Sequence, residues 1–340
     1  MDTSASARRA VRRALDWSPI GRLGARPDKL TNGPGSTQRP GSTEGRPQVE
    51  AGAQGDKGDR HPHVLIVGGY LTQPLSYGPL RRRLLARGAA SVTIAPVHIP
   101  DWLAAAMVGF GPLLLRTGLA VRRVHRAAGD TPIIVVGHSA GGLLSRLAMS
   151  DIPFRGRRMA VSDRVGALVT LGTPHELAQQ PFSFAHAGIE AAAFLSRHAP
   201  GARFAPRTAY VTVGSDLVRP TVAPARHLWD RLLGALFRFA VGPTTDAGGD
   251  GIVQLSAVHL SGARQLSFHD VRHGHFGSPW YGDDEVVDRW WPVAVELWRE
   301  ALAVREGAGA GAPRRSSPSV DHTPVTPMAP VPIAPGNDIG

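Results

Sequence analysis

The stretch from Ile133 to Gly142 constrains the fold of this chain more than any other. Four apolar residues that favour strands, 133–136, run into the turn Gly-His-Ser-Ala-Gly, and residues 143–149 have the composition of a helix. The residue at the tip of such a strand-to-helix turn, here Ser139, takes a strained backbone conformation. Glycines two residues before and after it let the strand and the helix approach each other. The stretch therefore predicts a buried strand that holds a serine at the top of a sheet.

The position of Ser139 at such a turn is typical of a catalytic nucleophile. The helix that follows directs the backbone N–H of Ala140, with the positive end of its dipole, toward the Ser139 hydroxyl. That N–H would supply half of an oxyanion hole. The hydroxyl also needs a histidine base and a carboxylate that orients the base. His138 points away from the hydroxyl in turns of this kind, so we expect it to pack and to form hydrogen bonds.

Apolar strands alternate with helices through the middle of the chain. Strands are expected at 64–67, 91–95, 133–136, 165–171, 209–213 and 265–268, and helices at 80–87, 103–128 (interrupted near 109–112), 143–149 and 286–304. Continuous apolar strands separated by helices are typical of a mostly parallel sheet with helices on both faces. Functional residues in such sheets gather beyond the carboxyl ends of the strands. We therefore predict a single α/β domain over residues 61–305.

Both ends of the chain differ from this middle part. Residues 1–60 are rich in Gly, Pro, Ser, Thr and Arg, and residues 306–340 are rich in Gly, Ala and Pro. Neither segment has a sustained hydrophobic period, so neither can bury enough apolar surface to order itself. We expect a disordered basic extension over 1–60 and a disordered tail over 306–340.

Arginine carries nearly all of the positive charge, and the formal net charge is +11. Lysine occurs only at Lys29 and Lys57, and no basic stripe is interleaved with aromatic residues. Nucleic acid is therefore not an expected partner. The chain contains no cysteine, which excludes a disulfide framework and a thiolate metal site.

The sequence contains no recognisable membrane-spanning or secretory segment. It has no run of about 18 apolar residues, and no apolar core follows the arginines between Arg8 and Arg13, as a secretory signal would require. We therefore expect a cytoplasmic location. A short arginine-rich helix over 7–17 would still allow a transient contact with a membrane surface.

The residues alone leave the partners of Ser139 open. In a sheet of this kind the acid follows the serine in the chain, and the histidine comes last. Two histidines, His273 and His275, lie in the loop after the last expected strand. Asp216 follows the strand at 209–213, whereas Asp250 lies in a turn bracketed by glycines. Topology alone slightly favours Asp216 as the acid.

Six short stretches carry a resemblance to a known family. They are Val67–Leu71, Ile99–Trp102, Gly137–Gly142, Leu171–His175, Gly249–Val253 and Trp280–Gly282. From about residue 62 to residue 297 the chain resembles an α/β-hydrolase of the lipase and esterase kind. It is similar in particular to a lipase-like group found in bacteria and plants.

The resemblance implies a function and a set of site residues. It implies a serine hydrolase that cleaves carboxylic esters, of lipids or other acyl groups, without a cofactor or a metal. The implied catalytic residues are Ser139, Asp250 and His273, and the implied oxyanion donors are the N–H groups of Tyr70 and Ala140. Asp216 and His275 remain the alternative acid and base. An acyltransferase or thioesterase with the same triad, and a non-catalytic membrane-surface or interaction protein on this fold, are the alternative functions.

Overall fold

The computed structural model describes residues 60–176, 186–218, 248–274 and 279–310. All of them lie within one compact unit, Asp56–Gly340. The extensions predicted to be disordered lie outside the described residues, except at their inner ends. There the prediction needs a correction, because residues 306–310 belong to a helix that continues to Ala310. These residues include two glycines, and they are helical because they extend a helix that is already formed.

A six-stranded sheet forms the centre of the fold, and all of its strand pairs are parallel. Its order is β2-β1-β3-β4-β5-β6. The strands are β1 (His63–Val67), β2 (Ser91–Ile94), β3 (Ile133–His138), β4 (Val165–Leu171), β5 (Ala209–Ser215) and β6 (Arg264–Phe268). The predicted parallel α/β architecture is therefore confirmed. The strand that leads to Ser139 lies inside the sheet, between β1 and β4.

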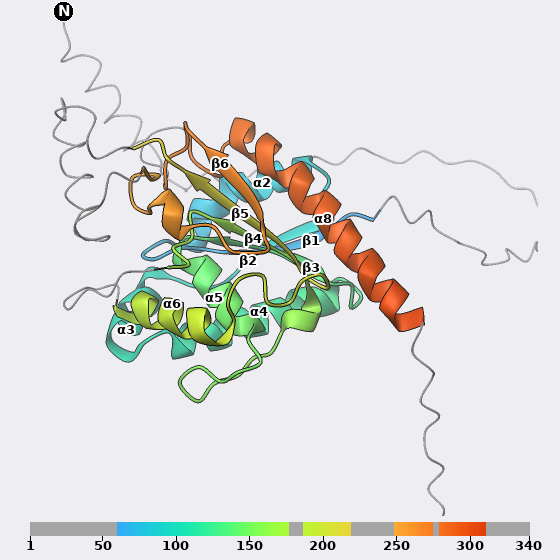
Figure 1. Ribbon diagram of the computed structural model, residues 1–340, viewed down its shortest axis with the longest axis horizontal. Coiled ribbons are helices and arrows are strands. Elements are labelled where there is room, and N and C mark those ends of the chain that lie inside the picture. The colour runs from blue at the N-terminus through green and yellow to red at the C-terminus, as the bar shows by residue number, and fades with distance from the viewer. Residues whose placement is uncertain (1–59, 177–185, 219–247, 275–278, 311–340) are drawn as a thin grey trace, which may run out of the picture. The chain divides into compact units, whose positions relative to one another are not determined.

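Helices cover both faces of this sheet (Figure 1). One face carries α2 (Gly78–Ala86) and α8 (Asp284–Ala310), and the other carries α3 (Ile99–Val108), α4 (Gly111–Ala127), α5 (Ala140–Met149) and α6 (His186–His198). Three short 3-10 helices, η1 (Pro74–Tyr77), η2 (Ser162–Arg164) and η3 (Leu255–Ala257), lie in the connections. None of the helices in the described residues is long and apolar enough to cross a bilayer.

The apolar strand sequences fill two separate cores because successive side chains point to opposite faces. In β1, Val64 and Ile66 pack beneath α2 and α8. Leu65 and Val67 pack on the opposite side, beneath α3–α6. All four side chains are fully buried. This double burial explains why the strands read as unbroken apolar runs rather than as alternating patterns.

The predicted helix over 103–128 forms two helices, the first of which begins four residues earlier than expected. Pro100 and Pro112 lie in the first turns of α3 and α4, where the missing proline N–H breaks no helical hydrogen bond. Gly109 separates the two helices with φ = 78°, a left-handed value that favours glycine. The expected interruption near 109–112 is thus confirmed.

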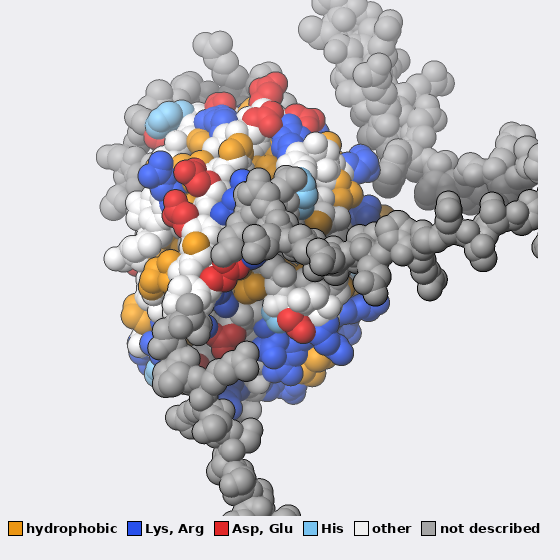
Figure 2. Space-filling view, turned by 90° about the vertical axis from the view of Figure 1, so that its right-hand side faces the viewer, with side chains coloured by type: hydrophobic (Ala, Val, Ile, Leu, Met, Phe, Trp, Pro, Cys, Tyr) orange, Lys and Arg blue, Asp and Glu red, His pale blue; other side chains and the backbone are white. Residues whose placement is uncertain are grey.

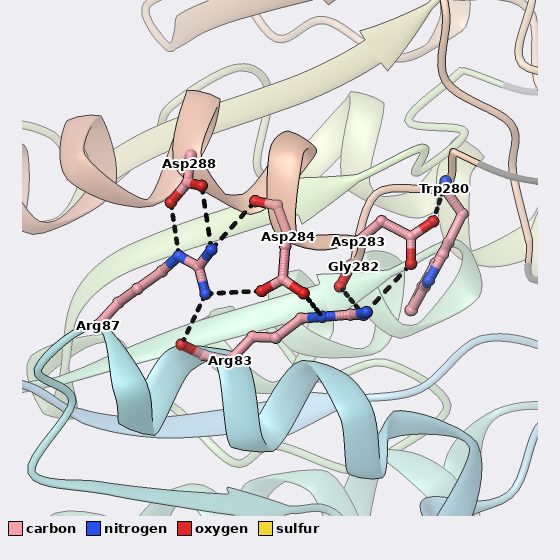
Figure 3. Close-up of polar contacts among 7 residues, drawn as sticks. All are labelled: Arg83, Arg87, Trp280, Gly282, Asp283, Asp284 and Asp288. Atoms are coloured by element: carbon pink, nitrogen blue, oxygen red, sulfur yellow. Dashed lines mark hydrogen bonds and ion pairs between the residues drawn. The ribbon is translucent and has the colours of Figure 1, made fainter.

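Ion pairs join α2 to the beginning of α8 (Figure 3). Arg87 forms two hydrogen bonds with Asp288, of 2.6 and 3.0 Å, and one of 3.0 Å with Asp284. Arg83 donates to Asp284 at 2.9 Å and to the carbonyl oxygen of Gly282 at 2.6 Å. The second contact ties α2 to the segment just before α8, which contributes to the candidate site described below.

Part of the positive charge of the chain lies on the surface of the described domain. Figure 2 shows Lys and Arg side chains gathered at the lower right of one face. These side chains are arginines, because both lysines lie outside the described residues.

Candidate active site

Ser139 lies between β3 and α5 in the tight turn that the sequence predicts. Its φ of 53° and ψ of −128° fall outside the conformations that non-glycine residues ordinarily adopt. The neighbouring backbone holds it there. Its N–H donates to the carbonyl oxygen of Leu171 at 2.9 Å, and its own carbonyl oxygen accepts from the Thr173 hydroxyl at 2.9 Å.

The glycines around Ser139 are required by close packing. A Cβ on Gly137 would lie 2.6 Å from the Cα of Gly142. A Cβ on Gly142 would overlap the Thr173 side chain. On the far side of the serine, a Cβ on Gly69 would lie 2.8 Å from the Ser139 Cβ. The loop after β1 therefore lies directly against the serine, as the sequence predicts for a loop that supplies an oxyanion donor.

Asp250 and His273 form a buried hydrogen-bonded pair. Their side chains meet at 2.8 Å between the Asp250 Oδ2 and the His273 Nδ1, and these side chains are only 1% and 8% exposed. The backbones are joined as well, since the His273 N–H donates to the carbonyl oxygen of Asp250 at 2.9 Å. With Nδ1 engaged as a donor to the carboxylate, Nε2 of the neutral imidazole is left as an acceptor.

Four hydrogen bonds surround the Asp250 carboxylate. Oδ1 accepts from the backbone N–H groups of Ile252 and Val253, at 3.0 and 2.8 Å, and Oδ2 accepts from His273 and from the Tyr281 hydroxyl, both at 2.8 Å. Burial raises the pKa of Asp250, but the interaction with His273 and the backbone N–H groups of Val253 and Ile252 outweigh burial and hold the pKa below its ordinary value. Asp250 therefore stays ionised beside the imidazole.

Tyr281 is a member of the site that the sequence reasoning missed. It belongs to the segment that Arg83 ties to α2, and its side chain is fully buried. Burial, together with the charge and the hydrogen bond of Asp250, raises the pKa of Tyr281 well above its usual range, so the phenol remains a donor. The stretch Trp280–Gly282 carried part of the family resemblance, but nothing in its local pattern indicated a contact with Asp250.

The imidazole of His138 links the two sides of the site. Its Nε2 donates to the carbonyl oxygen of His273 at 2.8 Å, and its Nδ1 lies 2.8 Å from the Tyr77 hydroxyl. That hydroxyl in turn accepts from the backbone N–H of Gly69 at 2.8 Å. A carbonyl oxygen can only accept, so Nε2 of His138 carries a proton. The Tyr77 hydroxyl also lies 3.3 Å from the Thr72 hydroxyl, to which it can donate. The packing and hydrogen-bonding role predicted for His138 is confirmed.

The two expected oxyanion donors belong to the loop after β1 and to the start of α5. Tyr70 follows Gly69 in the loop that contacts the serine, and Ala140 begins α5. Among the residues that the structure describes, none accepts a hydrogen bond from either backbone N–H. The Tyr70 ring packs edge-on against Trp102 of α3, with 5.6 Å between the ring centroids. This contact attaches the loop to the helix layer.

Asp216, the alternative acid, contacts His269 rather than His273. Asp216 Oδ1 is 2.6 Å from the Nδ1 of His269, whose side chain is 79% exposed. The structure thus brings Asp250 rather than Asp216 to His273. His275, the alternative base, lies outside the described residues.

Comparison with known proteins agrees with this topology. A family model described as a PGAP1-like alpha/beta domain matches residues 119–192, which include β3, the Ser139 turn, α5 and β4. A parallel sheet covered by helices, with a strained serine turn between a central strand and the next helix, is characteristic of the α/β-hydrolase fold. The chain has the α/β-hydrolase fold.

Solved structures with low sequence identity are similar to this chain. A lipase from Bacillus licheniformis, BlEst2 in its mature form, is 15% identical, covers 70% of this chain and 92% of its own, and has a TM-score of 0.46. An esterase of Thermogutta terrifontis, Est2, is also 15% identical, covers 78% of this chain and 88% of its own, and has a TM-score of 0.40. No curated protein matches the chain.

Behind the serine turn of this α/β-hydrolase fold, α5 carries a buried cation. Arg146 is 4% exposed, and it donates to the carbonyl oxygen of Ala199 at 2.6 Å and to Nδ1 of His175 at 3.2 Å. Burial lowers the pKa of Arg146 to about 10. Burial, the Arg146 charge and His259 together hold the pKa of His175 well below its usual range. His175 is therefore a neutral structural side chain.

No hydrogen bond joins the Ser139 hydroxyl to His273 in this structure. Catalytic hydrogen bonds are often long before substrate binds and tighten only in the complex. The described geometry therefore contains an oriented imidazole and a strained serine on adjacent loops of the α/β-hydrolase fold.

Proposed function

We propose that the chain is a serine hydrolase that cleaves carboxylic esters, of lipids or other acyl groups, through an acyl-enzyme. The observation that carries this proposal is the buried pair of Asp250 and His273 beside a serine held in a left-handed turn. A buried, oriented imidazole next to a strained serine is the arrangement that activates a hydroxyl for acyl transfer. The proposal assigns Ser139 as the nucleophile, His273 as the base and Asp250 as the acid.

In the first step, His273 Nε2 removes the proton of the Ser139 hydroxyl while the oxygen attacks the ester carbonyl. The Asp250 carboxylate accepts a hydrogen bond from Nδ1–H of His273, so Nε2 is the atom that accepts the serine proton. The negative charge of Asp250 then stabilises the imidazolium that forms. The negative charge that develops on the carbonyl oxygen is met by the backbone N–H groups of Tyr70 and Ala140. Loss of one such donor typically costs about 2.7–4 kcal/mol of transition-state stabilisation.

In the second step, the imidazolium of His273 gives its proton to the leaving alcohol as the carbon–oxygen bond of the ester breaks. This leaves the acyl group on Ser139. Water then attacks the acyl-enzyme, and His273 takes the proton of the water and returns it to the serine oxygen. The products are a carboxylic acid, an alcohol and the free enzyme.

Labelling with a fluorophosphonate probe tests this assignment directly. We expect the probe to label the full chain and to lose its target in Ser139→Ala. Ser145→Ala is the matched control because Ser145 lies on α5, the helix that follows Ser139, and its hydroxyl donates to the carbonyl oxygen of Gly141 at 2.7 Å. Absence of labelling in the folded wild type, or equal labelling of Ser139→Ala, would refute the nucleophile.

A substrate panel tests the class of reaction. Wild type and Ser139→Ala are compared on p-nitrophenyl esters of increasing chain length, on glycerolipids and on acyl thioesters, each with and without an added alcohol acceptor. Hydrolysis of esters that depends on Ser139 supports the proposal. Faster thioester cleavage would point to the thioesterase alternative, and an acylated alcohol as the main product would point to an acyltransferase.

A further inference from the structure

The exposed apolar side chains of the described domain are concentrated beside the candidate site. Eight large hydrophobic side chains are exposed. Five of them lie on the neighbouring helices α3 and α4: Leu103, Met107, Val108, Leu115 and Leu119. Two more, Leu71 and Leu75, lie in the connection after β1, directly beyond Tyr70. Such clustering marks a contact surface, whereas single exposed apolar residues need no explanation.

Apart from Asp101 in its first turn, which pairs with Arg116, helix α3 is apolar on both of its faces. Its inner face buries Trp102 and Ala105, while its outer face exposes Leu103, Met107 and Val108, of which Met107 is 89% exposed. The other exposed residues between them are the alanines at 104 and 106, so this face carries no charge. A helix that is hydrophobic all round is expected to be covered on both sides. The outer face of α3 is therefore a candidate binding surface.

Arginines border this apolar face where α3 ends. In the segment 155–158, Arg155 donates to the carbonyl oxygen of Val108 at 3.3 Å, and a Cβ on Gly111 would lie 3.2 Å from Nε of Arg157. Arg155 is neutralised by Glu190 at 2.8 Å. Arg157 and Arg158 are exposed, and neither forms an ion pair with any residue that the structure describes.

Further cations lie on α4 beyond its exposed leucines. Arg123 and Arg126 are exposed and likewise have no carboxylate partner within the described part of the chain. Leu115 and Leu119 are therefore followed along the same helix by positive charge. An apolar helix surface edged by unpaired arginines is complementary to a lipid bilayer with anionic headgroups, which takes up both components at once.

We infer that the outer surface of α3 and α4, with its border of arginines, binds an anionic phospholipid membrane. Tyr70, the expected oxyanion donor, packs against Trp102 on the inner side of α3, with 5.6 Å between the ring centroids. Binding of α3 would therefore bring the loop that carries Tyr70 close to the membrane. This surface is distinct from the catalytic residues, and the inference does not require that the ester hydrolase assignment be correct.

Vesicle sedimentation with the full chain tests the inference. We expect the protein to bind phosphatidylcholine vesicles that contain phosphatidylglycerol, and to bind less as salt rises because screening weakens the attraction. The double variant Leu103→Ser/Met107→Ser should bind about tenfold more weakly, owing to lost apolar burial. The double variant Arg157→Glu/Arg158→Glu should lose most of the preference for phosphatidylglycerol, since each arginine contributes about fivefold near an anionic surface.

Matched controls lie on α8, on the other face of the sheet. Val304 is 40% exposed and Arg299 is exposed, so Val304→Ser and Arg299→Glu repeat the two kinds of change away from α3. These controls should bind vesicles like the wild type. All variants are made in the full chain, so any vesicle binding by the arginines of residues 1–59 is the same in each of them.

Two outcomes would overturn the inference. One is the absence of vesicle binding by the wild type, or equal binding by the α3 variants and the α8 controls. The other is a concentration-dependent dimer, seen by light scattering, that Leu103→Ser/Met107→Ser abolishes while vesicle binding is unchanged, which would assign the surface to a second copy of the chain. Binding by Ser139→Ala, measured in parallel, separates failure of this inference from failure of the proposed reaction.

Discussion

The imidazole of His138 is hydrogen-bonded to the backbone of His273, with 2.8 Å between Nε2 and the carbonyl oxygen. The residue beside the candidate nucleophile thus holds the loop of the candidate base. Its other nitrogen lies 2.8 Å from the Tyr77 hydroxyl, which accepts from the Gly69 N–H at the same distance. One side chain therefore connects the base loop, the serine turn and the oxyanion loop.

Replacing His138 should impair catalysis, although His138 is not expected to contact the substrate. His138→Phe retains a ring but removes both nitrogens, so the His273 carbonyl oxygen loses its hydrogen bond to His138 and the Tyr77 hydroxyl loses one of its partners. We expect kcat for a p-nitrophenyl ester to fall about 100-fold, because small displacements of a catalytic group have effects of this size. KM should change little.

The same variant should lose about 1–3 kcal/mol in the free energy of unfolding, since buried polar groups lose their partners. Urea denaturation measures this loss. Tyr77→Phe, which leaves the bond between His138 and His273 in place, serves as the milder comparison. An unchanged kcat in folded His138→Phe would show that the bridge does not position the base.

The two candidate acids should separate clearly in activity. Asp250→Asn keeps the shape of the side chain but removes the charge that orients His273, and a comparable change in a serine protease lowers kcat about 10⁴-fold. Asp216→Asn should leave ester hydrolysis near the wild-type rate, because Asp216 contacts His269 on the surface. Steady-state kinetics of both variants, with circular dichroism to verify folding, decide between them. Collapse of activity in Asp216→Asn alone would reverse the assignment.

Gly69→Ala tests the oxyanion loop. The added methyl would lie 2.8 Å from the Ser139 Cβ, so the loop that carries the Tyr70 N–H must move away. Because loss of one oxyanion donor lowers kcat by about 10²–10³, we expect a loss in that range. Gly307→Ala is the control, since no heavy atom lies within 4 Å of the added Cβ. If Gly69→Ala retains full kcat, the loop does not supply a donor.

The low pKa of His175 predicts acid sensitivity. A histidine whose pKa is lowered in the folded state contributes stability above its unfolded pKa of about 6.5, and that stability is lost as the pH falls below this value. Between pH 7.5 and pH 5.5 protonation of this one residue in the unfolded state should therefore lower the free energy of unfolding.

His175→Gln cannot gain a proton, so its free energy of unfolding should fall less over this interval, although the variant is less stable at pH 7.5. Urea titrations at both pH values measure the difference. An equal pH dependence in His175→Gln and wild type would show that His175 is not buried in its neutral form.

Much of the architecture could be predicted because it depends on local pattern. Burial on both faces of a parallel sheet produces unbroken apolar runs, and all six expected strands are present within two residues of their predicted ends. The serine turn was equally predictable, because the apolar strand, the Gly-His-Ser-Ala-Gly turn and the following helix are consecutive in the chain. The end of α8 was misjudged, because residues 306–310 have the composition of a tail but continue an existing helix.

The sequence by itself determined the order of strands and helices and the strained serine between β3 and α5. The residues alone left the acid open between Asp216 and Asp250, and the family resemblance implied Asp250. The tertiary structure decided which carboxylate meets which imidazole: Asp250 pairs with His273, 23 positions later, while Asp216 pairs with His269. It also brought Tyr281 onto Asp250. The physical reason is that side-chain hydrogen bonds depend on positions to within a fraction of an ångström. Residues this far apart in the chain acquire such positions only when the sheet and its covering helices set the loops beside one another.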